Sequence, residues 1–432
     1  MRMSRRDLLK MLPVAASAVW MTNFKAIAAP YAKSAKITNI KVMGLDNLAE
    51  SCLVKIETDA GLFGLGESGH TAGVTRALVE TMKPLLIGQD PLAIEKYHYL
   101  LTSFVHPEAP VYPVVGGIDI ALWDLAGKIM DRPPYQLLGG AVQRDLPVYS
   151  HGNGVNMLDK GACKAWADEV KAAPEGYHTF KFTAFVPPAR PSGTLAPPAG
   201  AAAGGGFMRN GGKGGFPFSQ TLDLDDFRRI AIGYGNLREA VGPDVDLAAH
   251  CLNNYDLRSA MGMCKALEPV NPMWIEDPLS ADYTPAWKEL RQFSRIPILT
   301  GERVMMLKGF KPYLDNQVVD MLHVDPPVAG GITASREIAS YAALTQTPIG
   351  FHSGTCSLVQ FYASLHLTAA TPNIFKVENM LGKSRGFKEN MATVKLAVRN
   401  AMLRVPEGPG LGLELNVDWV KSHLQRGEVW WG

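Results

Sequence analysis

The stretch Pro-Met-Trp-Ile-Glu at residues 272–276 is a short apolar run that ends on an acidic residue, and four similar runs follow it. Residues 297–302 end at Glu302, residues 321–325 at Asp325, residues 348–352 at His352 and residues 374–378 at Glu378. The steps between the five polar residues are 26, 23, 27 and 26 residues. A strand, a helix and two short loops take about that much chain, so the spacing predicts successive βα units.

Eight segments in the second part of the chain have the composition of short strands, and helical stretches such as residues 257–267 and 332–345 separate them. The strand candidates are residues 146–151, 179–183, 244–250, 273–276, 297–302, 318–325, 347–352 and 374–378. This alternation predicts an α/β fold, a (β/α)7β TIM-type barrel over residues 144–394. The C-terminal strand ends of such a barrel converge on one mouth, so residues distant in sequence become neighbours there.

The segments on either side of the barrel have different patterns. Residues 37–143 begin with alternating strands around the turn at residues 59–61 and continue with helical periodicity, which predicts an α+β capping domain. Residues 395–432 lack a clear eighth helix, and we expect them to return to the capping domain.

Residues 186–220 interrupt the barrel after its second strand with a sequence rich in glycine, proline and alanine. Such a composition has too few bulky side chains to pack, which predicts a mobile loop at the barrel mouth. A tolerated insertion without a function and a lid over an anionic ligand both remain open.

Residues 1–29 contain Ser-Arg-Arg-Asp-Leu-Leu-Lys at positions 4–10, an apolar run at 11–21 and Ala-Ile-Ala at 26–28. This resembles a twin-arginine export signal, so we expect folded export to the periplasm and no membrane association after cleavage. An amphipathic first helix or an uncleaved membrane anchor is the alternative interpretation.

The 432-residue chain is 47% hydrophobic and carries a net charge of +2, which gives no reason to expect nucleic acid as a partner. Its five cysteines have no repeated spacing, so the sequence does not indicate which of them pair, if any.

Five segments then identify a family. They are Gly-Gly-Ile-Asp-Ile-Ala-Leu-Trp-Asp at 116–124, Leu-Leu-Gly-Gly at 137–140, Trp-Ile-Glu-Asp-Pro at 274–278, Thr-Gly-Glu-Arg at 300–303, and Asp325 followed by Ala-Gly-Gly-Ile at 329–332. In this order and spacing they resemble the enolase superfamily, mandelate racemase subgroup, and within it acid-sugar dehydratases of the galactonate and mannonate type. Members of that family act on small carboxylates, and the resemblance also implies a homo-oligomer.

The resemblance implies one divalent metal ion, Mg²⁺ in most relatives, which stabilises the enediolate formed when the proton next to a carboxylate is removed. Glu276 and Glu302 match two of the three ligand positions. The family's aspartate on the third strand is replaced by His250, and Leu252 stands where some dehydratases have a histidine. Because imidazole suits softer ions, Mn²⁺, Fe²⁺ or Zn²⁺ is also open. Asp246 is a fallback ligand, although we expect it to lie too deep in the barrel.

The catalytic base expected from the resemblance is His352, with Asp325 on the preceding strand as the carboxylate that orients its ring. Glu378 matches the residue that hydrogen-bonds the substrate carboxylate. The family's Lys-x-Lys pair on the second strand is reduced to Lys181 and Thr183. Lys181 is expected to neutralise substrate charge, whereas Thr183 does not act as a base at neutral pH.

Other candidates to contact substrate at the predicted mouth are Thr183, His151, Asn153 and Arg303. Loops of the capping domain at residues 64–70 and 104–108 are expected by resemblance to close over the ligand.

Three functions are consistent with these residues. The first is a periplasmic metal-dependent lyase that dehydrates a sugar acid. The second is a racemase or epimerase of a 2-hydroxy acid, which the loss of the second lysine disfavours. The third is a catalytically retired barrel that binds a sugar acid, motivated by the departures at Thr183, His250 and Leu252.

Overall fold

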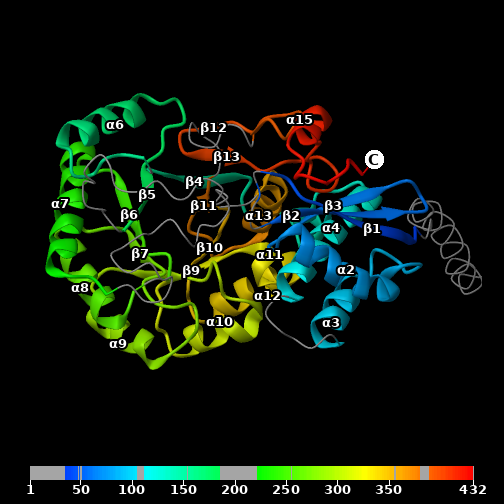
Figure 1. Ribbon diagram of the computed structural model, residues 1–432, viewed down its shortest axis with the longest axis horizontal. Coiled ribbons are helices and arrows are strands. Elements are labelled where there is room, and N and C mark those ends of the chain that lie inside the picture. Colours follow the sequence, from blue (N-terminus) through cyan, green and yellow to red (C-terminus); the bar gives the residue numbers. More distant parts are fainter. Residues whose placement is uncertain are drawn as a thin grey trace, which may run out of the picture.

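The structure is a computed structural model that describes residues 35–46, 48, 51–104, 111–152, 154–184, 221–253, 255–354, 357–379 and 389–431. The predicted export signal, the insertion at residues 186–220 and the candidate Asn153 lie outside the described residues, as does most of the expected loop at 104–108. Figure 1 shows a smaller N-terminal domain at one side of a larger α/β domain, with the C-terminal segment running across the top of both.

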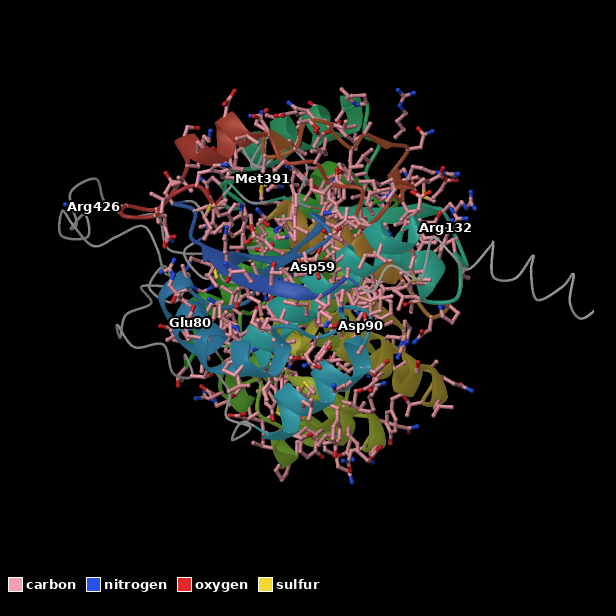
Figure 2. The ribbon with its side chains drawn as sticks, turned by 90° about the vertical axis from the view of Figure 1, so that its right-hand side faces the viewer. Asp59, Glu80, Asp90, Arg132, Met391 and Arg426 are labelled. Atoms are coloured by element: carbon pink, nitrogen blue, oxygen red, sulfur yellow. The ribbon has the colours of Figure 1, made fainter. Side chains whose placement is uncertain are left out.

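The N-terminal domain begins with an antiparallel sheet in the order β1-β2-β3, formed by Ile37–Met43, Cys52–Thr58 and Phe63–Ser68. Helices α2 (Ala72–Leu86), α3 (Ile94–Phe104), α4 (Val111–Met130) and α5 (Pro134–Leu137) follow. Figure 2 views the molecule from this domain, with Asp59 in the turn after β2 near the centre.

The sheet packs closely on the largely buried helix α4. At Gly66 of β3 a Cβ atom would lie 2.0 Å from the carbonyl oxygen of Gly117 in α4, so only glycine permits this approach. The expected loop at 64–70 is mostly strand, because residues up to Ser68 belong to β3, and residues 64–68 are buried.

The eight predicted strands of the larger domain are present, most of them shorter than the sequence pattern suggested. They are β4 (Asp145–His151), β5 (Thr179–Thr183), β6 (Asp246–His250), β7 (Trp274–Glu276), β8 (Ile298–Thr300), β9 (Met321–Val324), β10 (Ile349–Phe351) and β11 (Val377–Glu378). β4 to β10 are parallel neighbours in chain order. β11 pairs with β4, and Ile374 just before it bridges Ile349 of β10, so the ring of strands returns to its start.

Helices cover the outside of this ring, as the ribbon shows (Figure 1). They are α6 (Lys160–Ala172), α7 (Leu224–Val241), α8 (Leu257–Leu267), α9 (Pro285–Phe293), α10 (Met306–Asp315), the short α11 (Pro326–Ala329) with α12 (Gly331–Leu344), and α13 (Leu358–Ala370). Each occupies the connection between two successive strands, which confirms the (β/α)7β architecture with its α+β capping domain.

The C-terminal segment contacts both domains. Its strand β13 (Met402–Arg404) pairs antiparallel with β4 of the barrel, and β12 (Val398–Arg399) pairs antiparallel with β13, an extension of the sheet that the sequence pattern does not indicate. Beyond them, α15 (Val417–Ser422) leads to Gln425, whose backbone N–H donates to the carbonyl of Gly44 in the N-terminal domain.

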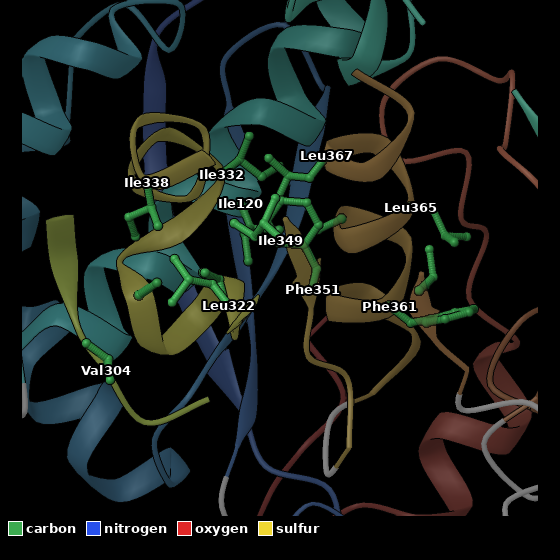
Figure 3. Packing of buried hydrophobic residues seen from close by; sticks show 14 of the residues in the cluster. Ile120, Val304, Leu322, Ile332, Ile338, Ile349, Phe351, Phe361, Leu365 and Leu367 are labelled. Carbon is green, nitrogen blue, oxygen red and sulfur yellow. The ribbon is translucent and has the colours of Figure 1, made fainter. Parts of the chain in front are cut away.

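The core between the two domains is apolar. Figure 3 shows Ile120 of α4 among residues of β9, β10, α12 and α13, including Leu322, Ile332 and Ile349.

The four described cysteines, Cys52, Cys163, Cys251 and Cys264, are buried free thiols. Within the described residues, no helix combines the length and the apolar character needed to cross a bilayer.

Candidate metal centre and active site

The interior of the barrel has an apolar layer directly below a polar one. Tyr149, Ala248, Trp274, Leu299 and Met321 form a buried cluster. Because side chains on one face of a strand recur every two residues, His151, His250, Glu276 and His323 occupy the next level toward the C-terminal strand ends. The apolar layer closes the barrel from below, so the polar side chains face the mouth.

Four side chains converge at that mouth: His250, Glu276, Asp277 and Glu302 each offer one ligand atom, and these atoms lie within 4.8 Å of one another. His250 Nε2 is 3.5 Å from Glu302 Oε2, 3.6 Å from Asp277 Oδ2 and 3.8 Å from Glu276 Oε1. The predicted ligands His250, Glu276 and Glu302 are therefore together. Asp246 lies at the opposite end of β6 against Lys376, which agrees with its expected depth.

Two atoms in this cluster are unsatisfied. Neither His250 Nε2 nor Asp277 Oδ2 has a hydrogen-bond partner among the described residues, and Asp277 is only 1% exposed. Buried polar atoms are rarely left without a partner, so their convergence suits a bound ion. One imidazole and three carboxylates fit a divalent cation, and the imidazole favours a transition metal over Mg²⁺.

Glu276 is held from several directions. Its Oε1 accepts from Lys181 Nζ at 2.8 Å and lies 3.1 Å from Nδ1 of His323, and its Oε2 accepts from the Trp274 indole at 3.0 Å. Burial alone would raise the pKa of Glu276, but Lys181, His250 and His323 hold it well below its usual range. Glu276 is consequently an ionised, rigidly oriented carboxylate.

Glu378 and Lys181 form a second buried ion pair, with Lys181 Nζ 2.7 Å from Glu378 Oε1. The same oxygen is 2.5 Å from Nε2 of His151, and the other oxygen accepts from the backbone N–H of Ser353 at 2.7 Å. Burial lowers the pKa of Lys181, but the nearby carboxylates of Glu276 and Glu378 outweigh this effect and raise it. Lys181 therefore already balances two carboxylates of the protein and is only 2% exposed.

His352 and Asp325 form the predicted pair. His352 Nδ1 lies 2.7 Å from Asp325 Oδ2, while Nε2 is 3.2 Å from Glu302 Oε2 and 3.6 Å from Glu378 Oε2. Burial lowers the pKa of His352, and the carboxylates of Glu378 and Glu302 together with the bond to Asp325 outweigh this and raise it to about 10. A cation beside Glu302 would offset part of that negative charge and favour the unprotonated ring.

Glu302 reaches the centre because the chain turns sharply after β8. Gly301 has φ 136°, and a Cβ atom there would lie 2.9 Å from the backbone oxygen of His323, so the position requires glycine. The neighbouring Arg303 Nε is 3.4 Å from Glu302 Oε1, and its side chain is 39% exposed, at the rim of the site. Thr183 is opposite His250 in the pairing of β5 with β6.

Asp277 and His323 were missed as site residues, although both had a signal in the sequence. Asp277 directly follows a predicted ligand, and its left-handed backbone, with φ 49°, turns the side chain back toward the cluster. His323 precedes Asp325 by two residues, so strand alternation places it on the same inward face.

Comparison with known proteins agrees with this architecture. A family model described as "Enolase C-terminal domain-like" matches residues 165–419, and the N-terminal domain model of mandelate racemase and muconate lactonizing enzyme matches residues 36–139. The chain therefore belongs to the enolase superfamily, in the group of mandelate racemase and muconate lactonizing enzymes.

Individual relatives cover most of the chain. A D-xylonate dehydratase from Haloferax volcanii is 31% identical over 92% of this chain and 91% of its own, and a D-mannonate dehydratase from a Sphingomonas species is 31% identical over 84% and 89%. Among solved structures, an enolase of the mandelate racemase subgroup from Agrobacterium tumefaciens has a TM-score of 0.76 at 26% identity, over 90% of this chain and 96% of that one.

Proposed function

We propose that this protein is a metal-dependent lyase that dehydrates a sugar acid by removing the proton next to its carboxylate. The observation that carries the proposal is the 3.2 Å separation of His352 Nε2 and Glu302 Oε2. A base oriented by Asp325 thereby adjoins a cluster able to hold a cation. The relatives named for D-xylonate and D-mannonate support the substrate class.

The proposed reaction uses His352 twice. The proton on the carbon next to the carboxylate passes to Nε2 of His352, and its electron pair stays on the substrate. The adjacent carbon–hydroxyl bond then breaks as the double bond forms, and the hydroxyl leaves as water with the proton returned from Nε2. The enol so formed tautomerises to a 2-keto-3-deoxy acid.

His250, Glu276, Asp277 and Glu302 would hold the metal. A divalent cation there would stabilise the negative charge that develops on the substrate carboxylate. The protein's part is to keep these donors in place, and contacts from Lys181, His323 and Trp274 do this for Glu276.

The roles of Lys181 and Glu378 are refined by their contacts. Lys181 was expected to neutralise substrate charge directly, but it is buried between Glu276 and Glu378. We assign it to fixing these two carboxylates. Glu378 lies 3.6 Å from His352 Nε2, where it stabilises the protonated ring after proton abstraction. We assign contact with substrate hydroxyls to Thr183, to Arg303 and to His151, which also contacts Glu378.

The test is incubation of metal-loaded protein with a panel of sugar acids in D₂O, followed by ¹H NMR. Exchange of the proton next to the carboxylate with formation of a 2-keto-3-deoxy acid is expected for at least one of D-xylonate, D-mannonate, D-gluconate and D-galactonate. Exchange or inversion without water loss would support the epimerase instead. A protein that binds a sugar acid but catalyses neither reaction would be the retired barrel.

Light scattering on the same preparation tests the expected homo-oligomer.

We propose in addition that residues 1–29 direct twin-arginine export to the periplasm, which is supported by the paired Arg5 and Arg6 ahead of the apolar run. Replacing both arginines with lysine is expected to leave the full-length chain in the cytoplasmic fraction. Unchanged periplasmic recovery of the variant would contradict the proposal.

A further inference from the structure

A buried glutamate of the N-terminal domain contacts the barrel helix that follows the catalytic histidine. Glu67 on β3 accepts from the backbone N–H of Ser357 at 2.7 Å, from the Ser357 hydroxyl, and from the backbone N–H of Gln360 at 3.0 Å. Ser51 Oγ of the same domain donates to it at 2.8 Å. Glu67 thus satisfies N–H groups at the start of α13, where a negative charge is favourable.

Gln360 connects Glu67 to the proposed base His352 through hydrogen bonds. Its side-chain nitrogen donates to Asp325 Oδ2 at 2.7 Å and to the backbone oxygen of His352 at 2.9 Å. An amide nitrogen has two N–H groups, so both are used and the orientation of the amide is fixed. Gln360 is 3% exposed, so these hydrogen bonds are buried in the protein.

The carboxylate of Asp325 is consequently held at both oxygens. Oδ2 accepts from Gln360 and lies 2.7 Å from His352 Nδ1, and Oδ1 accepts from the backbone N–H of Val328 at 3.0 Å. Without Gln360, the backbone oxygen of His352 loses its side-chain donor and Asp325 gains freedom to rotate about its side-chain bonds.

We propose that Gln360 is a positioning residue for the Asp325–His352 pair and that Glu67 fixes Gln360 from the N-terminal domain. This inference rests on the proposed function of His352 as the base. Docking of the two domains then holds the base in position.

The experiment compares Gln360→Met, Gln360→Glu and Glu67→Gln with Ser364→Ala in the metal-loaded protein. Ser364 is on the same helix, is fully buried, and its hydroxyl has no partner among the described residues, so Ser364→Ala controls for packing of α13. Melting temperature and metal content verify that each variant is folded and loaded. Proton exchange of a sugar acid in D₂O and the ¹⁵N signals of His352, assigned through His352→Asn, are the readouts.

We expect Gln360→Met to slow proton exchange by about 10- to 100-fold with metal affinity unchanged, because a misplaced base costs that much. The His352 ¹⁵N signals should shift in Gln360→Met, further in Gln360→Glu, and in the same direction in Glu67→Gln. Wild-type signals in folded Gln360→Met and Gln360→Glu would overturn the inference. The NMR signals are informative even if no sugar acid exchanges, a result that would instead count against the proposed function.

Discussion

Nε2 of His250 and Oδ2 of Asp277 face each other at 3.6 Å in the barrel mouth, and neither has a hydrogen-bond partner among the described residues. The family's aspartate ligand is absent from the position of His250, and the free oxygen of Asp277 supplies a carboxylate to the same space. Asp277 is thus a fourth candidate donor beside His250, Glu276 and Glu302.

Asp277→Asn is accordingly expected to weaken metal binding by about 10- to 100-fold, because an amide oxygen is a poorer ligand than a carboxylate. Isothermal titration with Mn²⁺ measures the affinity. Asp246→Asn, on the same strand as His250 but at its far end, is the control and should bind as wild type. Equal affinities of both variants would exclude Asp277 from the centre.

His250→Asp restores the ligand type expected from the family resemblance. Since oxygen ligands suit Mg²⁺ and imidazole suits transition metals, the variant should gain affinity for Mg²⁺ relative to Mn²⁺. Competition titrations with the two ions give the ratio. An unchanged ratio would mean that His250 does not ligate the ion.

His352→Asn removes the proposed base but retains a side chain able to donate toward Asp325. We expect turnover of a sugar acid to fall by about 10³-fold or more, with metal affinity within twofold of wild type. Steady-state kinetics on the substrate found in the panel and a metal titration test this. Substantial remaining activity would assign proton abstraction to another residue.

His366 on α13 predicts a pH dependence of stability away from the metal centre. Burial lowers its pKa to about 4, partly offset by the bond of Nε2 to the backbone oxygen of Leu411 at 3.0 Å. The folded chain therefore keeps the ring neutral while the unfolded chain takes up a proton as the pH falls below 6.5. The stability that the folded chain gains from keeping His366 neutral is fully present above pH 6.5 and is lost as the pH falls toward 4.

The size of that effect is measurable. From pH 7 to pH 5 the wild type should lose about 2 kcal/mol more unfolding free energy than His366→Gln, which retains a donor for Leu411 but does not titrate. Urea unfolding at both pH values measures the difference. The exposed His178→Gln should behave as wild type, and the same pH slope in His366→Gln would disprove the assignment.

Asp124 joins three parts of the chain. It accepts from the backbone N–H of Leu65 in β3 and of Leu411 in the C-terminal segment, both at 2.7 Å, and from Lys128 Nζ at 2.6 Å. Asp124→Asn places an N–H group against one of these donors and should cost about 3 kcal/mol of unfolding free energy. Denaturant unfolding measures it, with the exposed Asp418→Asn as control. A loss below 1 kcal/mol would show that the segments are held mainly by other contacts.

Much of the fold was predictable because strand ends and helices recur at βα spacing, and the order from Glu276 to Glu378 was enough to define the mouth. The positions of His250 and Glu302 in one cluster follow from that topology alone. The ends of the strands were less predictable. Strands β8 and β10 extend over only three residues each, and the polar residues Glu302 and His352 lie just beyond their ends.

The contacts of Asp277, Gln360 and Lys181 were not predictable in the same way. The orientation of Asp277 depends on a left-handed backbone at a non-glycine residue, which local pattern does not indicate. Gln360 is one of several buried polar residues in α13, and the sequence alone does not show that it is the one beside Asp325. Lys181 has the residue type to bind substrate, and only three-dimensional proximity shows that two glutamates already pair with it.

The most direct test of the account is anomalous diffraction from crystals grown with Mn²⁺. It should show one peak bonded to His250 Nε2 and to carboxylate oxygens of Glu276, Asp277 and Glu302, with His352 Nε2 facing it. An absent peak at saturating Mn²⁺, or a peak whose ligands exclude His250 and Glu302, would contradict the claim that this barrel places a histidine base beside a metal ion.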